Sequence, residues 1–569
     1  MAHILSESFS EATRTLINEA PNEHSIDHYQ GQLIEHIQVL EAEIRSLKYR
    51  HNAVSVTCRL PPNILSSIFL AVLDITGRNA SRSEPVHDGL EDGCVGLWTK
   101  LHIWERSYIE AVPSRCRTAP LSVKFPWFSK DTGEPERLLE MVMPYIGQFR
   151  VVDMYWPSTP ITGLPWYDAL VKWNRAVPVL EELHLNKAGL PFGCLPAAIL
   201  QGGAPNLRKL VVDNYHLPWP GALMSDSLTK LVLRGNAFSR SRPLATDFLG
   251  SLGKLKRLET LELQGYIPKD FVQSNQSSKH PCLLPALQHL QITDDPELTP
   301  NFFKLVGLPE STTQITLAME PDHCSYGLTD YGGSCIGHTL RNLKQSFEWE
   351  NRIRGPAALT LKLYFKADIS TTRSVDEGLC LAFQLPAELP PIDTCLSIFD
   401  THLNLSNITS LDIKMDPFPC GLSAETWTII SRLPNLNTLC ISGPHAGILQ
   451  HIIKEWEVQL QSSTALGPCF PSLSNLTLLG IEIAGQGDGS PRSLTPQLVT
   501  VLKAQAATGN SVSRLHIQDC WQISEADYLF AKETLPEIKI EWDRHGERRD
   551  PVDYLKVDIG WGIQWGEGT

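Results

Sequence analysis

A short pattern of apolar residues recurs along the chain from residue 149 onward. Each unit reads apolar-x-x-apolar-x-apolar, and in several units a proline stands two residues before the first apolar position. Because side chains alternate between the two faces of a strand, we predict one short strand per unit, with the second and third apolar residues buried and the first anchoring the preceding turn. The second apolar residues of the units are Val152, Leu183, Leu210, Leu231, Leu261, Leu290, Ile315, Leu361, Leu411, Leu439, Leu476, Leu515 and Ile538.

This pattern resembles the signature of leucine-rich repeats, without most of the terminal asparagines of that signature. It predicts an α/β fold in which residues 149–545 form an irregular leucine-rich-repeat solenoid. The second apolar positions lie 21 residues apart between Leu210 and Leu231 and 50 apart between Leu361 and Leu411, against about 20 to 29 in regular arrays. We expect the two largest insertions, residues 319–357 and 365–405, to hold an extra helix or a loop on one edge.

A different pattern precedes the repeats. Between residues 23 and 56 the apolar residues follow 7, 4, 3, 4, 3 and 7 spacing, which predicts a helix with a heptad seam. A helix of this length is stabilised mainly by packing its apolar face. Two alternatives stay open: self-association as a coiled coil, or packing onto the next apolar helix of the chain. The seam consists of Ile26, Leu33, Ile37, Leu40, Ile44, Leu47 and Val54.

Residues 60–70 predict that next helix. Two prolines suit its start, where their missing N–H groups and fixed φ do no harm. Four apolar residues then form a single stripe at helical spacing, and such a stripe needs a partner surface. The residues of this segment that form the helix start and the apolar stripe are Leu60, Pro61, Ile64, Leu65, Ile68 and Phe69.

These residues, together with Leu97-Trp98 further on, resemble the first helix and the closing motif of an F-box. The order of heptad helix, box and repeats is most similar to the F-box-like proteins of mushroom-forming fungi. The resemblance implies that residues 57–104 bind a Skp-type adaptor of a cullin ubiquitin ligase through the stripe and Trp98. It also implies that the repeats hold a protein substrate, and that the chain is a subunit of an SCF-type ligase rather than an enzyme.

The chain departs from the F-box pattern between residues 74 and 96. The family carries a second helix there, whereas this segment has the glycine, asparagine, serine and proline content of a loop. A second hypothesis follows, in which the chain is a leucine-rich-repeat scaffold unconnected to ubiquitin and a degenerate box caps the array.

Residues between the buried strand positions face the concave surface of the predicted solenoid and are candidates for substrate binding. Neighbouring lysines and an arginine can form a basic patch for an acidic peptide, or a solvated face neutralised by Asp213 and Glu262. The candidates are His184, Lys209, Lys230, Arg234, Glu262 and His516.

The remaining segments are assigned from weaker patterns. Residues 1–22 are polar and predict a disordered tail. Residues 105–148 predict a connector and repeat cap, with a strand at 121–125 where apolar and polar residues alternate. Residues 546–569 predict a tail that covers the last strand, because an exposed edge invites pairing with other chains.

Composition narrows the function. The chain has 569 residues and a formal net charge of −14, which argues against binding nucleic acid or an anionic membrane. It shows no secretory signal and no apolar run of the length needed to span a bilayer. Its 13 cysteines are scattered without a Cys-x-x-Cys pair, which indicates reduced thiols in a cytoplasmic or nuclear protein.

No linear motif for catalysis, metal or nucleotide binding stands in the sequence. The glycine-rich run 485–489 lacks the lysine of a phosphate-binding loop. We therefore expect no catalytic residues, cofactor or metal. An active site assembled across the concave face, which would leave no linear trace, is a third hypothesis.

Overall fold

The protein is described from a computed structural model, which divides into a first unit, Met1–Val123, and a second unit, Lys124–Thr569. The boundary falls inside the predicted connector, before the repeats. The described residues are 10–18, 26–54, 100–102, 118–125, 140–156, 170–171, 173–187, 193–219, 221–235, 242–271, 282–309, 312–319, 331–346, 359–365, 379–385, 397–399, 401–402, 405–415, 424–443, 446–466, 469–481, 483–485, 492–493, 495–507, 509, 512–521 and 523–543.

In the first unit the heptad pattern forms the long helix α3, Ile26–Val54, as predicted. A second helix, α2, spans Glu11–Asn18, so the prediction of a disordered tail is wrong for these residues. A hydrogen bond of 2.9 Å between Thr13 Oγ1 and His36 Nε2 joins the two helices. At the start of α2 the N–H of Thr13 donates to Ser10 Oγ at 3.2 Å. The strand β1 covers Lys100–His102. The box helix and Trp98 lie outside the described residues.

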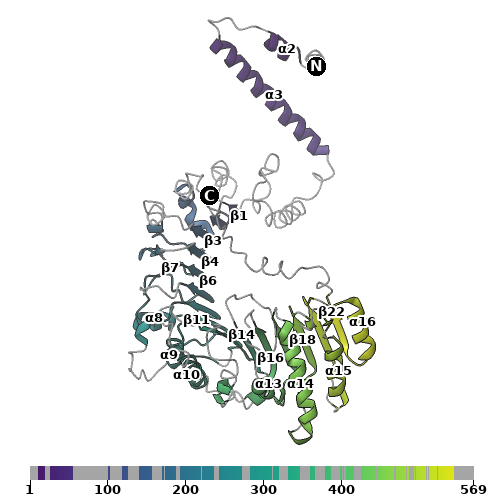
Figure 1. Ribbon diagram of the computed structural model, residues 1–569. Coiled ribbons are helices and arrows are strands. Elements are labelled where there is room, and N and C mark those ends of the chain that lie inside the picture. The colour runs from purple at the N-terminus through teal and green to yellow at the C-terminus, as the bar shows by residue number, and fades with distance from the viewer. Residues whose placement is uncertain are drawn as a thin grey trace, which may run out of the picture. The chain divides into compact units, whose positions relative to one another are not determined.

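The second unit is built on a parallel sheet. From β3 its strands follow the order β3-β4-β6-β8-β9-β11-β13-β15-β14-β16-β17-β18-β21-β22 (Figure 1). Their bounds are β3 Phe149–Trp156, β4 Glu182–Lys187, β6 Lys209–Asp213, β8 Lys230–Arg234, β9 Thr260–Gln264, β11 His289–Asp294, β13 Gln314–Met319, β14 Leu359–Phe365, β15 Leu379–Leu385, β16 Ile408–Met415, β17 Thr438–Ser442, β18 Asn475–Leu479, β21 Arg514–Gln518 and β22 Lys539–Trp542.

The register of the sheet aligns the apolar positions predicted from the sequence. Leu183 pairs with Leu210, Leu210 with Leu231 and Leu231 with Leu261. Further along, Leu411 pairs with Leu439. Because each second apolar residue stands beside its counterpart, the inward side chains form continuous rows, and no strand buries its own row without neighbours. The prediction of one strand per unit is confirmed from β3 through β21.

The buried rows make the core. The second and third apolar residues of the units in β4 through β11 are at most 1% exposed, and those in β17 and β18 at most 2%. The first apolar residue of these units is equally covered, as Leu207 and Leu436 show at 0%. Its N–H bonds back into the turn, at 3.1 Å from Leu207 to the Ala204 carbonyl. The anchoring role predicted for this position is therefore confirmed.

A repeated hydrogen bond links each turn to the next. The Glu181 carbonyl, just before β4, accepts the N–H groups of Arg208 and Lys209 at 2.8 and 3.0 Å. The Arg208 carbonyl then accepts those of Thr229 and Lys230 at 2.8 and 2.9 Å. These bonds satisfy the buried backbone at the start of each strand, as the low polarity of the core requires.

The far ends of the strands use residues that tolerate positive φ. Asn214 follows β6 with φ 60°, Gly265 follows β9 with φ 66° and Gly480 follows β18 with φ 58°. Each donates its N–H to the neighbouring strand end, for example from Asn214 to the Arg234 carbonyl at 2.7 Å. The left-handed region costs little for glycine and asparagine, which explains these residues at the turn out of the strand.

Two predictions about the repeats are wrong. The insertion 365–405 contains β15, which pairs with both β13 and β14 and therefore lies inside the sheet rather than on an edge. The predicted position of the last strand is wrong by two residues, since Leu515 pairs with Ile540 rather than with Ile538. Ile538 instead bonds back to the Leu535 carbonyl at 3.1 Å, as the anchoring residues do. The last unit is one residue shorter between its anchor and its strand.

Helices and short strands connect the main strands. The insertion 319–357 holds the helix α10, as expected. Phe470 connects α13 (Ala424–Ser431) with α14 (Ala446–Leu466), because its ring lies 5.4 Å from that of Trp427 and 4.9 Å from that of Trp456. The helices α14, α15 (Thr495–Ala507) and α16 (Glu525–Thr534) lie side by side (Figure 1). The helices are α8 Ala245–Leu252, α9 Thr299–Leu305, α10 Tyr331–Ser346, α13 Ala424–Ser431, α14 Ala446–Leu466, α15 Thr495–Ala507 and α16 Glu525–Thr534, with short helical turns η4 Met143–Gln148, η5 Lys269–Phe271 and η7 Leu405–Asn407. The short strands are β5 Gly193–Cys194, β7 Tyr215–His216, β10 Cys282–Leu283, β12 Val306–Gly307, β19 Ala484–Gly485 and β20 Arg492–Ser493.

The strand predicted in the connector is β2, Leu121–Phe125, which alternates buried and more exposed residues. The cysteines within the described ranges are free thiols. Burial raises the pKa of Cys469 and of Cys520 to about 12, so both stay protonated at neutral pH. No helix in the described part of the chain is long and apolar enough to cross a bilayer.

Candidate protein-binding face of the sheet

The predicted substrate-binding residues lie on the face of the sheet opposite the buried rows. Along β4, β6 and β9 the exposed and buried positions alternate, with the charged residues at the more exposed positions. The register places Glu182, Lys209 and Lys230 in one row and Asn186, Asp213 and Arg234 in another. His184 and Glu262 share the row between them, separated by Val211 and Val232. The structure thus brings five of the six candidates together.

Lys209 is paired on this face. Its ammonium lies 3.1 Å from Glu182 Oε2, and His184 Nε2 lies 3.4 Å from the same oxygen. Burial lowers the pKa of His184, and the neighbouring Lys209 lowers it further, against the opposing effects of Asp153 and Glu182. At neutral pH the imidazole is therefore uncharged, and Glu182 is shared between one cation and one neutral ring.

Arg234 is paired with two carboxylates. Its Nε lies 2.6 Å from Glu262 Oε1 and its Nη1 3.9 Å from Asp213 Oδ2. Burial raises the pKa of Asp213, Arg234 works to lower it, and Glu262 adds to the increase. Burial likewise works to lower the pKa of Arg234, but Glu262 and Asp213 outweigh burial and the pKa is raised. The arrangement favours a neutralised face over a basic patch.

The same face continues to β2 and β3, from which no candidate residue was chosen. Asp153 on β3 pairs with Lys124 on β2 at 3.6 Å. Tyr155, also on β3, stands beside Asn186 in the register, and burial, followed by the charge of Asp213, raises its pKa. The sequence pattern could have identified Asp153 and Tyr155, because they occupy the same alternate positions in the unit of Val152 as the candidate residues do in later units.

His516 lies apart from the other five candidates. It stands on β21, towards the other end of the strand order, between Thr477 and Glu541. Arg514 Nη2 and Lys539 Nζ lie 2.6 and 2.7 Å from Glu541, and their hydrogen bonds lower the pKa of Glu541 to about 2, the bond from Lys539 contributing most. The predicted register of the last unit put Lys539, rather than Glu541, beside His516, so it did not indicate this second charged group.

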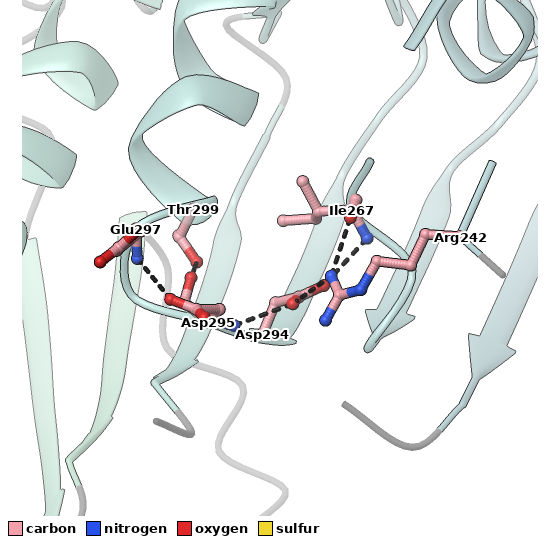
Figure 2. Close-up of polar contacts among 6 residues, drawn as sticks. All are labelled: Arg242, Ile267, Asp294, Asp295, Glu297 and Thr299. Atoms are coloured by element: carbon pink, nitrogen blue, oxygen red, sulfur yellow. Dashed lines mark hydrogen bonds and ion pairs between the residues drawn. The ribbon is translucent and has the colours of Figure 1, made fainter. Parts of the chain in front are cut away.

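A buried ion pair lies at the end of β11, apart from the exposed charged residues. Figure 2 shows Arg242 reaching Asp294 at the end of β11. Arg242 Nη1 donates to Asp294 Oδ1 at 2.6 Å and to the Ile267 carbonyl at 2.8 Å. Asp294 Oδ2 accepts the Ile267 N–H at 2.9 Å, and Asp294 Oδ1 accepts the Asp295 N–H at 2.8 Å.

Both partners of this pair are removed from water, since the Arg242 side chain is 4% exposed and the Asp294 side chain 0%. Burial raises the pKa of Asp294, and Arg242 and the two N–H donors oppose that increase. The loop that leads into α9 begins directly after Asp294, and there the Asp295 carbonyl accepts a hydrogen bond from Thr299 Oγ1 at 3.1 Å. The pair therefore connects the buried end of β11 with the segments that hold Arg242 and Ile267.

Within the described ranges, no group of three or more histidine, cysteine, aspartate or glutamate side chains is placed to hold a metal ion. The predicted adaptor-binding residues, Leu60 to Phe69 and Trp98, lie outside the described residues. No protein-family model matches the chain, and no curated protein matches it. Chemically, the arrangement is a face on which Lys124, Lys209 and Arg234 are each paired with a carboxylate.

Proposed function

We propose that the protein is a non-catalytic substrate receptor of an SCF-type cullin ubiquitin ligase. In this proposal the F-box-like segment 57–104 binds a Skp-type adaptor, and residues 149–545 form a leucine-rich-repeat solenoid that holds a protein substrate. The single observation that carries the proposal is the in-register row of parallel strands. That row turns one repeated sequence pattern into a continuous face of side chains.

The leucine-rich-repeat assignment is supported by more than the order of the strands. The first, second and third apolar residues of the repeated pattern keep the same structural roles, anchor, core and core, in the units of β4 to β11 and of β16 to β21 whose burial the structure describes. The turn hydrogen bonds repeat with them, as at Glu181 and Arg208. Repeats of this kind use the face left outside the core as an extended binding surface.

The charges of that face favour a folded protein as the ligand. Lys209 and Arg234 already contact Glu182 and Glu262, so the face has little surplus positive charge for a polyanion. A protein surface that offers both a carboxylate and a cation can offset part of the free-energy cost of desolvating these pairs. Charged rows of this type set orientation and specificity more than affinity.

The adaptor half of the proposal rests on the sequence of residues 60–70 and on the order of heptad helix, box and repeats. It is tested by measuring binding of the purified full chain to a fungal Skp-type adaptor. We expect binding by the parent chain and its loss in the variant Ile64→Asp with Ile68→Asp, which places two charges on the apolar stripe. The matched control is Ser66→Asp with Ser67→Asp, which adds the same charge to the same segment off the stripe.

The control variant is expected to bind the adaptor as the parent does. No binding by the parent chain, or unchanged binding after substitution of Ile64 and Ile68, would count decisively against the receptor proposal.

The second candidate function is a repeat scaffold unconnected to ubiquitin, and the loop composition of residues 74–96 favours it. In that case the segment 60–70 packs on the chain itself as a cap. Substitution of Ile64 and Ile68 by aspartate would then lower the melting temperature of the chain, and the parent would bind no adaptor. The two candidates therefore differ in both readouts.

A further inference from the structure

The apolar seam of α3 remains largely open to solvent. Ile37 is 53% exposed, Ile44 50% and Leu47 66%, while Leu33 and Leu40 on the same seam are half-buried. The seam runs along a helix of 29 residues, or about 43 Å at 1.5 Å per residue. A row of exposed branched residues of this length is not stable in water without a partner.

The order of residues along the seam indicates what kind of partner fits. In the heptad, Ile37 and Ile44 occupy a positions, and Leu33, Leu40 and Leu47 occupy d positions. Isoleucine at a with leucine at d favours two parallel helices, because the β-branched side chain fits the hole that a parallel dimer forms at a. The same seam supplies both halves of such a pair.

The residues that flank the seam on one copy of α3 are complementary to those on a second copy. In a parallel pair, each g position faces the e position five residues later on the partner helix. Glu43 at g therefore faces Lys48 of a second copy, and the exposed Ile34 at e faces Tyr29. The third pair of this kind joins His36 with Glu41, and no like charges meet in any of the three.

The short helix α2 leaves this seam available. Thr13 of α2 forms a hydrogen bond with His36 of α3, which is a g residue at the flank of the seam. The a residues Ile37 and Ile44 keep their exposure although α2 is in place. A second helix can approach from the a side while α2 stays on the flank.

We propose that α3 pairs with α3 of a second copy of this chain as a parallel, in-register, two-stranded coiled coil. The dimer would carry two sheets of the second unit and two box segments, and so would bind a ligand with repeated sites more tightly than one copy does. The inference rests on α3 alone and does not depend on adaptor binding.

The mass of the full chain in solution tests the pairing. Light scattering or sedimentation at micromolar concentration is expected to give twice the chain mass of 63.4 kDa. The variant Ile37→Lys with Ile44→Lys places like charges at two a positions and is expected to give a single chain mass. The matched control, Val39→Lys with Ser46→Lys, adds the same charge at two c positions, one of them the exposed Val39, and is expected to stay dimeric.

The orientation is tested by charge reversal at the flanks. Glu43→Lys alone, or Lys48→Glu alone, is expected to raise the dimer dissociation constant by roughly two- to tenfold at low salt, and the two changes together are expected to restore it. Additive weakening by the two changes would contradict the parallel arrangement. A parent chain that is monomeric at tens of micromolar, or a dimer unaffected by Ile37→Lys with Ile44→Lys, would overturn the proposal.

Discussion

Two regions of this chain carry repeated apolar patterns, but the apolar residues are buried in one region and exposed in the other. In the sheet, apolar residues such as Leu439 and Leu476 are at most 2% exposed because the neighbouring strands cover them. In α3, Ile44 and Leu47 are at least 50% exposed. A periodic pattern therefore predicts the element and its apolar face, but the cover comes from the units beside it. The sheet supplies its own cover, whereas the helix leaves its seam for another chain.

The largest expected effect contrasts one residue from each region. Leu439→Asp buries an unpaired charge in the rows of the core and is expected to destabilise the second unit by more than about 4 kcal/mol. Ile37→Asp puts the same charge on the exposed seam and is expected to leave the melting of the sheet unchanged. Chemical denaturation followed by far-UV circular dichroism measures both. Equal melting of Leu439→Asp and the parent chain would show that the register is wrong.

The next largest effect comes from the buried ion pair. Asp294→Ala leaves the Arg242 guanidinium buried without its carboxylate and is expected to cost about 3–5 kcal/mol. Asp294→Asn keeps one oxygen that can still accept from Arg242, loses the acceptor for the Ile267 N–H, and is expected to cost less than the alanine variant. Urea unfolding of the two variants separates them. If the alanine variant were as stable as the asparagine variant, the pair would not hold the connecting segments together.

A smaller effect is expected at the turn after β6. Asn214 has φ 60° and its Nδ2 donates to the Lys187 carbonyl at 2.9 Å. Asn214→Ala loses this bond and puts alanine, which adopts the left-handed region less readily than asparagine, at a positive φ, at a cost of about 1–2 kcal/mol. Asn214→Gly loses the bond but fits the φ, so its loss should be smaller. Thermal unfolding of the two variants checks the order.

The smallest effect is a dependence on pH through His184. Burial lowers the pKa of this imidazole below 6.5, with Lys209 acting in the same direction and Asp153 and Glu182 opposing. The unfolded chain therefore takes up the proton first, and folding stability declines as the pH falls below about 6.5. The variant His184→Gln is expected to flatten this decline between pH 7.5 and 5.5. Urea unfolding across that range measures it, and an unchanged slope would contradict the assignment.

Sequence reasoning reached the parts of the structure that depend on local spacing. The strand positions from Val152 to Leu515 and the helix Ile26–Val54 follow from apolar periodicity alone. The strand β15 was missed because glycine stands at residue 378, where the pattern needs an apolar anchor three residues before Leu381. The last unit was misplaced because one residue is absent between its anchor and its strand.

The charged face was predictable only in part. Alternation along a strand identifies Arg234 and Glu262 as residues of one face, but not that their side chains meet at 2.6 Å. The pair of Arg242 and Asp294 joins residues 52 positions apart and outside any repeat, so no periodic signal identifies it. Contacts of this kind depend on the paths of the connecting segments.

The most direct test of the receptor proposal is hydrogen exchange along the full chain with and without a Skp-type adaptor. The account predicts that the adaptor slows exchange within residues 57–104 and leaves the amides of β4 through β18 unchanged. Slowed exchange only within the sheet, or no change anywhere at saturating adaptor, would contradict the claim that the front of the chain binds the adaptor while the repeats are left to bind the substrate.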